Sequence, residues 1–578
     1  MQQTGTLLTL ILAITPPKMG KRVFFGLLLA LVSINFAVGE DINSVLLAPG
    51  VRIQGEKEVS SRNPEKYGYA YYGIRYGTAS RFEHSTENTD FAYFQNPTRL
   101  KLGPVCPQAP FFEIGVEASP RVLSMEEDCL YLDVIVPRVH DAPKRGLPVM
   151  VFIYGGALQM GDKDMYNGTF LALETEAIYV AVNYRVSAFG FLSTGDDKLP
   201  GNYGLGDCKT ALEWVVKHIG KFNGDAARIT VFGESAGAIL TSALYMDPES
   251  RRYIRAAIAL SGSSLMDIAT KQDPRPLAEE LAEKVNCSKE CPYAMVQCLK
   301  TIPQSVLLNA ARKMEHGNPD LFPYGFVVDN VHIKKLPRLE LQEVKLDSRK
   351  STFITGYLRE DMSLLLVNTN PQIFDQAVPV TYAGIREMVA KQYLPTNDRC
   401  KTPQYDLAER VMKYYNISDI DDRGSMTLKF IHLASDSLFG YPALKESFAY
   451  AKQAQADGFG NQFYLISYDQ QLPGFGAFHA MELGYIFGDP LNKILFNLSL
   501  NDTVQASLLS MMREIVHNGK MDGPDFGREG SHMELTQTGH WEKGSTDFKA
   551  RFEFWEDVVN TPCSEIESGS ANKRSEEL

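Results

Sequence analysis

The sequence lacks an excess of basic residues. Lys and Arg together number 58 against 70 Asp and Glu, which gives a net charge of −12 and a pI near 5.5. A protein that binds nucleic acid needs a basic surface to displace the counterions of the phosphate backbone. The charge balance therefore argues against a nucleic-acid partner.

The sequence also lacks internal repeats, low-complexity tracts and, after residue 39, any uncharged apolar run of about 18 residues that would span a bilayer as a helix. Gly and Pro are spread along the chain as turn residues rather than gathered into a linker. Hydrophobic residues make up 44% and charged residues 22%, an ordinary globular composition. We therefore expect no transmembrane helix in the mature chain, one domain over residues 40–563 and a polar tail over 564–578.

The N-terminus has the features of a secretory signal. Basic residues at positions 18–22 precede the apolar run 23–37, and small residues follow before Glu40. We predict a signal-peptide region over residues 1–39. A start at Met19 would give a more conventional signal and would make the residues before it a gene-model extension.

Three further features fit a secreted or luminal protein. Eight cysteines follow the predicted signal, so some are expected to be paired. Residues 575–578, Ser-Glu-Glu-Leu, are close to a retention signal of the endoplasmic reticulum, although an acidic tail that ends in Leu by chance is the alternative. Five sequons offer sites for N-glycosylation, at Asn167, Asn286, Asn416, Asn497 and Asn501.

The most informative motif is Gly233-Glu234-Ser235-Ala236-Gly237, which has the G-x-S-x-G form of a nucleophile elbow. Residues 228–232 before it read as a buried strand, and residues 238–246 after it are rich in helix formers. A strand, a tight turn and a helix are the context that exposes a serine hydroxyl for attack. We predict that Ser235 is a nucleophile, the alternative being a Gly-rich turn with a spectator serine.

Apolar runs rich in β-branched residues alternate with helical patterns, which is typical of a mostly parallel sheet with helices on both faces. The predicted strands are 149–154, 178–183, 229–232, 256–260, 353–355 and 463–466. The better helical patterns are 209–218, 276–285, 385–393, 407–415 and 444–453. We expect the mostly helical stretch 380–455 to lie above the sheet as a lid or pocket wall.

A nucleophilic serine needs a base, an acid that holds the base, and donors for the oxyanion. His479 is the best candidate base, because it lies in a glycine-rich loop after the predicted strand 463–466, where such a sheet places its chemistry. Another histidine, such as His432 in a helical pattern, is more simply a packed or surface residue. The predicted donors are the N–H groups of Gly156, Ala157 and Ala236.

Several long motifs in order resemble the type-B carboxylesterase and cholinesterase family, from about Val51 to Trp555. They are Pro148 to Ala157, Asn183 to Val186, Phe189 to Leu192, Pro200 to Leu205 and Phe232 to Gly237. The resemblance implies an α/β-hydrolase fold with helical insertions over the active site. It also implies Asp361 as the acid, in the manner of bile-salt-activated lipases, with Glu360 as a competitor one residue out of register. Glu234 and Ser261 match positions that support the catalytic histidine in the family.

The resemblance further implies two disulfide bonds. Cys106 is expected to pair with Cys129, and Cys287 with Cys298, each contributing about 3 kcal/mol by limiting the unfolded chain. Four cysteines have no family partner: Cys208, Cys291, Cys400 and Cys563. A bridge between the last two stays open.

The expected activity is hydrolysis of apolar carboxylic esters through an acyl-serine intermediate, without a metal or other cofactor. The family's cholinesterases bind a quaternary ammonium over a Trp in the first disulfide loop, and this chain has no Trp between Cys106 and Cys129. Two alternatives remain: a non-catalytic binding protein of the neuroligin or neurotactin kind, and a stoichiometric scavenger of reactive esters. The acyl-chain preference and the oligomeric state are not determined by these patterns.

Overall fold

The computed structural model describes residues 43–90, 103–108, 124–317, 323–344, 351–375, 377–394, 404–457, 460–470, 472 and 474–561. The predicted signal region, Cys400, Cys563 and the polar tail lie outside the described residues. Within the described ranges, no helix is both long and apolar enough to cross a membrane.

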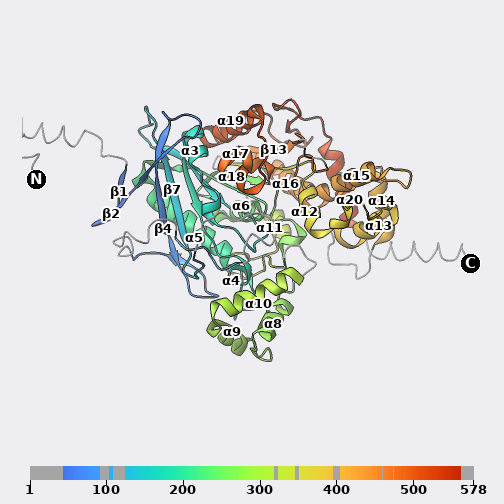
Figure 1. The fold of residues 1–578 in the computed structure, drawn as a ribbon, viewed down its shortest axis with the longest axis horizontal. Helices are drawn as coiled ribbons and strands as arrows, with labels where there is room; N and C mark the ends of the chain where they lie inside the picture. Colours follow the sequence, from blue (N-terminus) through green and yellow to red (C-terminus); the bar gives the residue numbers. More distant parts are fainter. Residues whose placement is uncertain are drawn as a thin grey trace, which may run out of the picture.

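A large central sheet organises the described part of the chain (Figure 1). Its strands run in the order β15-β14-β13-β12-β11-β10-β8-β9-β7-β4-β3. Their bounds are β3 Glu56–Val59, β4 Tyr67–Arg75, β7 Tyr131–Pro137, β8 Leu147–Ile153, β9 Ile178–Val182, β10 Gly224–Glu234, β11 Ile254–Leu260, β12 Thr352–Leu358, β13 Gly460–Ile466, β14 Met533–Leu535 and β15 Trp541–Lys543. Two small hairpins pair β1 (Ser44–Ala48) with β2 (Val51–Gln54) and β5 (Gly77–Thr78) with β6 (Thr86–Glu87).

The strands from β9 to β14 are parallel, whereas β3, β4, β7 and β15 pair antiparallel at the two edges. All six predicted strands are present, as β8 to β13. The patterns missed β7 although it is fully buried. Its apolar run is broken by Asp133, which is buried because Lys163 lies 2.8 Å from its carboxylate.

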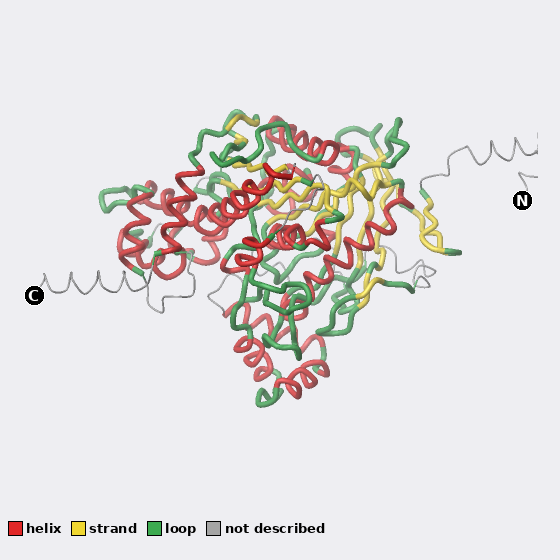
Figure 2. Tube along the Cα trace, turned by 180° about the vertical axis from the view of Figure 1, so that it is seen from behind, coloured by secondary structure: helices red, strands yellow, loops and turns green. Residues whose placement is uncertain are grey.

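Helices cover both faces of the sheet, and Figure 2 shows the strands lying between them. One group packs against β8 and β10 to β13: α5 (Tyr203–His218), α6 (Ala236–Met246) and α16 (Tyr441–Asp457), with α11 (Pro337–Glu343) lying against α6 and α16. A second group packs over β4 and β7 to β10: α3 (Thr169–Thr175), α17 (Met481–Phe487) and α19 (Asp502–Asn518). The α/β class and the mostly parallel sheet predicted from the sequence are therefore confirmed.

The remaining α-helices lie around this layered core (Figure 1). They are α4 Ser187–Phe191, α7 Pro248–Arg251, α8 Arg275–Lys284, α9 Pro292–Thr301, α10 Gln304–Gly317, α12 Met362–Thr369, α13 Tyr382–Met388, α14 Tyr405–Tyr414, α15 Arg423–Ser435, α18 Asp489–Leu495 and α20 Phe548–Asn560.

The stretch 380–455 is helical as predicted, but its parts have different places. α13, α14 and α15 form a group at one side of the molecule with α20 (Figure 1). The segment predicted as 444–453 is α16, which packs on β12 and β13 and so covers a face of the sheet. The π-helical turn Asp436–Gly440 before it reaches the loops that carry His479 and Asp361, where the ring of Phe439 lies 5.0 Å from that of His479.

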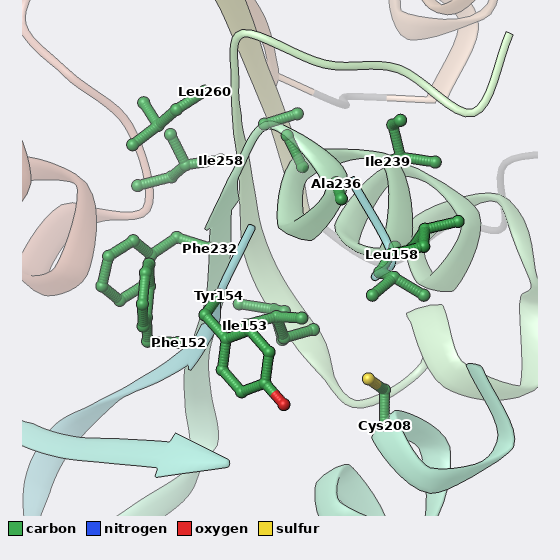
Figure 3. Packing of buried hydrophobic residues seen from close by; sticks show 14 of the residues in the cluster. Phe152, Ile153, Tyr154, Leu158, Cys208, Phe232, Ala236, Ile239, Ile258 and Leu260 are labelled. Carbon is green, nitrogen blue, oxygen red and sulfur yellow. The ribbon is translucent and has the colours of Figure 1, made fainter. Parts of the chain in front are cut away.

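The core beneath the elbow is densely aromatic. Phe152 of β8 and Phe232 of β10 have ring centroids 4.8 Å apart, and Figure 3 shows both rings on one side of the strands, with Ala236 and Ile239 of α6 on the other. All four side chains are completely buried. The elbow therefore stands on closely packed side chains of low compressibility.

Candidate active site

The turn at Ser235 joins β10 directly to α6. Ser235 has φ 56° and ψ −123°, an uncommon conformation for a residue with a side chain. Its N–H donates to the Leu260 carbonyl at 2.9 Å, and its carbonyl accepts from Ile239 at 3.0 Å. A Cβ at Gly237 would lie 2.0 Å from the Ile153 carbonyl oxygen, so the close approach of α6 to β8 requires glycine there.

His479 and Asp361 meet at the carboxyl ends of β12 and β13. His479 Nδ1 lies 2.6 Å from Asp361 Oδ1, and both side chains are buried. The other oxygen of Asp361 accepts a hydrogen bond from the Leu358 N–H at 2.9 Å. The structure thus brings Asp361 against His479, whereas the Glu360 carboxylate contacts His432 at 2.7 Å.

The second ring nitrogen of His479 points toward the elbow. Its Nε2 lies 3.1 Å from Glu234 Oε1, a close contact without the alignment of a hydrogen bond. No hydrogen bond to the Ser235 hydroxyl is found among the described residues. Contacts between catalytic groups are often long in a site without substrate and shorten when it binds.

The carboxylates around His479 decide its charge. Burial alone would lower the pKa of His479, but the nearby Glu234 and Asp361 outweigh it and raise this pKa to about 9. Burial, reinforced by Asp361, raises the pKa of Glu234 to about 7, against the attraction of His479. The site therefore stabilises an imidazolium, the form that a general base takes after it has removed a proton.

A third carboxylate was missed by the sequence patterns. Glu482 is completely buried in the first turn of α17, and neither of its oxygens has a hydrogen-bond partner among the described residues. Burial, with Glu234 and Asp361 adding to it, raises its pKa well above the usual value. His479 lies outside α17, since Ala480 between it and the helix has φ 65°, so helical spacing gave no signal for Glu482.

The loop after β8 presents the predicted oxyanion donors. Gly156 and Ala157 have φ values of 115° and 56°, and their N–H groups have no acceptor among the described residues. Ala236 is the first residue of α6, where an N–H lacks an intrahelical acceptor. A Cβ at the neighbouring Gly155 would lie 3.0 Å from Ser235 Cβ, so this loop lies directly against the nucleophile's turn.

Ser261 lies at the end of β11, next to the elbow. It is completely buried with φ 53°, and its N–H donates to the Gly356 carbonyl at 3.1 Å. Its hydroxyl has no hydrogen-bond partner within the described residues. A Cβ at the following Gly262 would lie 2.5 Å from the Ser235 carbonyl oxygen, which measures how closely β11 and the elbow approach.

Both predicted disulfides are present. Cys106 is bonded to Cys129, and Cys287 to Cys298. Among the described residues, Cys208 is a buried free thiol and Cys291 an exposed one.

The five sequon asparagines differ in exposure. Asn286, Asn416, Asn497 and Asn501 are exposed, as a glycosylation site requires. Asn167 is half-buried, and its side-chain oxygen accepts the Thr169 N–H at 2.9 Å.

Comparison with known proteins identifies the family of this chain. The model of the Carboxylesterase family matches residues 43–557. The bovine (Bos taurus) bile salt-activated lipase is 33% identical over 418 residues, covering 68% of this chain and 67% of that protein. The mouse (Mus musculus) bile salt-activated lipase is 30% identical over 503 residues, covering 81% and 79%. A pig (Sus scrofa) liver carboxylesterase is 29% identical over 509 residues, covering 83% and 86%.

Proposed function

The chain belongs to the carboxylesterase family and is a carboxylic ester hydrolase, and we propose that it cleaves esters with apolar acyl or alcohol groups through an acyl-serine intermediate. Ser235 would be the nucleophile, His479 the general base and Asp361 the acid that orients the imidazole. The observation that carries this proposal is the 2.6 Å contact between His479 and Asp361 beside the Ser235 elbow.

In the first half-reaction, His479 Nε2 removes the hydroxyl proton as Ser235 Oγ bonds to the ester carbonyl carbon. The negative charge moves to the carbonyl oxygen, where the N–H groups of Gly156, Ala157 and Ala236 would receive it. Removing one such donor typically costs about 3 to 4 kcal/mol of transition-state stabilisation. The C–O bond to the alcohol then breaks, and His479 returns its proton to the leaving oxygen.

In the second half-reaction, water replaces the alcohol. His479 removes a proton from water, the resulting hydroxide attacks the acyl carbon, and the bond to Ser235 Oγ breaks with return of the proton. Asp361 stays ionised throughout and stabilises the imidazolium. The products are a carboxylic acid and free enzyme.

The non-catalytic and scavenger alternatives are less well supported. A binding protein has no need of a buried His-Asp pair beside a strained serine, and the named relatives are lipases and carboxylesterases. A scavenger uses the same residues with slow deacylation, so it differs from an esterase in turnover and not in the site.

The test is the turnover of p-nitrophenyl acetate, butyrate and laurate by the glycosylated protein beside Ser235→Ala, with a fluorophosphonate label on both. We expect turnover and labelling to disappear together in the variant. Labelling without turnover in the wild-type protein would establish a scavenger, and neither signal from folded protein would establish a binding role. The chain-length profile separates carboxylesterase from lipase preference.

We also propose that the protein enters the secretory pathway. The two disulfides and four exposed sequons agree with that route. Deleting residues 575–578 and assaying the medium tests retention: increased secretion would identify the Ser-Glu-Glu-Leu ending as a luminal signal, and unchanged distribution would identify it as an ordinary tail.

A further inference from the structure

Glu360, the residue before Asp361, is tied to the loop that carries His479. Its Oε2 accepts a hydrogen bond from the Ala477 N–H at 2.9 Å, and its own N–H donates to the Ala477 carbonyl at 3.1 Å. Both polar groups of Ala477 are therefore held by one residue. The main chain two residues before His479 is fixed to the main chain one residue before Asp361.

His432 binds the other oxygen of the same carboxylate. Its Nε2 lies 2.7 Å from Glu360 Oε1, and it comes from a separate element, α15. The Glu360 side chain is 11% exposed and that of His432 is 33% exposed. Because both carboxylate oxygens are engaged, Glu360 has a fixed orientation between His432 and the Ala477 N–H.

A second tie holds the loop on the other side of Gly476. The Ser363 hydroxyl donates to the Phe475 carbonyl at 2.7 Å, and the Ser363 N–H donates to the Glu360 carbonyl at 2.8 Å. Gly476 has φ +61°, and a Cβ there would lie 2.7 Å from Glu360 Oε2. The loop is thus pinned at residues 475 and 477, with no space for a side chain between them.

The other charged groups near His432 already have partners. Arg359 lies 2.7 Å from Glu534, and Arg551 lies 3.1 Å from Asp436. With His432 they line a cavity of about 260 Å³. His432 is therefore the side chain that engages Oε1 of Glu360, as the two arginines contact other carboxylates.

We propose that Glu360 is a positioning residue for the reaction, with His432 holding its carboxylate in place. The pair sets the distance and angle between His479 and Asp361 by fixing the two main-chain segments that carry them, and neither side chain touches the substrate. This inference rests on the triad proposed above. A displacement of about 1 Å in a catalytic group can cost roughly 100-fold in rate, so loosening the loop should be visible in kcat.

The experiment compares Glu360→Ala, Glu360→Gln and the control Glu534→Gln, with active sites counted by fluorophosphonate titration. Glu534 is a matched control, since it is a similarly buried carboxylate paired with Arg359 and touches no residue of the His479 loop. We expect Glu360→Ala to lower kcat per titrated site by roughly 10- to 100-fold with KM unchanged within about twofold. Glu360→Gln keeps an acceptor for the Ala477 N–H and should recover most of kcat, and Glu534→Gln should match wild type.

A kcat per site within twofold of wild type in Glu360→Ala would overturn the proposal even if the melting temperature fell, because the role would then be structural only. An equal loss in Glu534→Gln would overturn it as well. If Glu360→Ala does not fold, Ser363→Ala decides by removing only the Phe475 bond: a fall in kcat of a few fold supports the proposal and an unchanged kcat overturns it.

The Ser235→Ala variant tests the proposed triad separately from the positioning role of Glu360. Activity that persists in Ser235→Ala would refute the proposed triad. Activity lost there but retained in Glu360→Ala would refute the positioning role alone.

Discussion

The proposed nucleophile and the proposed acid-base pair are held in place by different means. Ser235 is fixed locally, by a strand that ends at Glu234 and a helix that begins at Ala236, with contacts that leave space only for glycine at Gly237. His479 and Asp361 are separated by 118 positions and meet only because β12 and β13 are neighbours whose loops are tied together. From this difference we expect substitutions in the elbow either to be tolerated or to disrupt the turn completely. Substitutions around the acid-base pair should instead lower kcat by different amounts.

The largest expected effect breaks the acid-base pair. Asp361→Asn should lower kcat by roughly 10⁴-fold, because an amide no longer stabilises the imidazolium or enforces its tautomer. Steady-state kinetics with p-nitrophenyl butyrate measures this. Glu360→Gln, one residue away, is the matched control. If Glu360→Gln lost kcat to this extent and Asp361→Asn kept its activity, Glu360 would be the acid.

The second change tests the local rigidity of the elbow. Gly237→Ala places a methyl group 2.0 Å from the Ile153 carbonyl oxygen and 2.7 Å from that of Tyr154, both main-chain atoms of the core sheet. We expect destabilisation of about 4 kcal/mol or more, at the extreme of single substitutions. Thermal unfolding monitored by circular dichroism measures it. Gly220→Ala, where a Cβ meets nothing within 4 Å, is the control and should be neutral.

The third change lies outside both regions. Replacing Cys287 and Cys298 by Ser opens the loop between α8 and α9 and should lower the free energy of unfolding by about 3 kcal/mol. Neither the elbow nor the acid-base pair contacts this disulfide, so kcat at 25 °C should stay at the wild-type value. Denaturant unfolding and kinetics on the same sample test both statements, and a changed kcat would show that the two regions depend on the distant helices.

The smallest expected effect concerns the electrostatic interaction between Glu234 in the elbow and His479 in the acid-base pair. His479 must be neutral to act as a base, so kcat/KM rises with pH through its pKa, which lies at about 9 with Glu234 beside it. Glu234→Gln removes a raising influence and should move this limb to lower pH by roughly one to three units.

Below pH 7 Glu234 is itself largely protonated, so the difference between the two proteins should be greatest above that pH. The measurement is the pH profile of kcat/KM for both proteins. A shift to higher pH, or no shift, would mean that Glu234 does not act on the imidazole.

The sequence predicted the elbow well because its signal is local. Residues 228–246 contain the strand, the turn and the helix in one continuous stretch, and β10 and α6 form there. The predicted strands from 149 to 466 were also found, since parallel strands buried on both faces are continuous apolar runs. β7 was not predicted because Asp133 interrupts its apolar run. The contact with Lys163 explains why a carboxylate is buried there.

The acid was harder to predict than the nucleophile. Glu360 and Asp361 are adjacent carboxylates in one loop, and a periodic pattern gives no reason to prefer either. The family resemblance favoured Asp361 by register, and the structure brings Asp361 rather than Glu360 against His479. Glu482 was missed as well, since its raised pKa depends on burial and on Glu234 and Asp361, which come from other elements.

The sequence by itself therefore determined the α/β class, the family and the strained serine turn, because each depends on the order of residues along short or regular stretches. The resemblance to the family then implied the two disulfide pairs. The tertiary structure alone decided which carboxylate faces the imidazole, how three carboxylates raise its pKa, and how Glu360 and His432 hold the loop. The physical reason is that distances between charges on different strands are set by the packing of the sheet. Electrostatic interactions depend on those distances and on burial, which no local pattern contains.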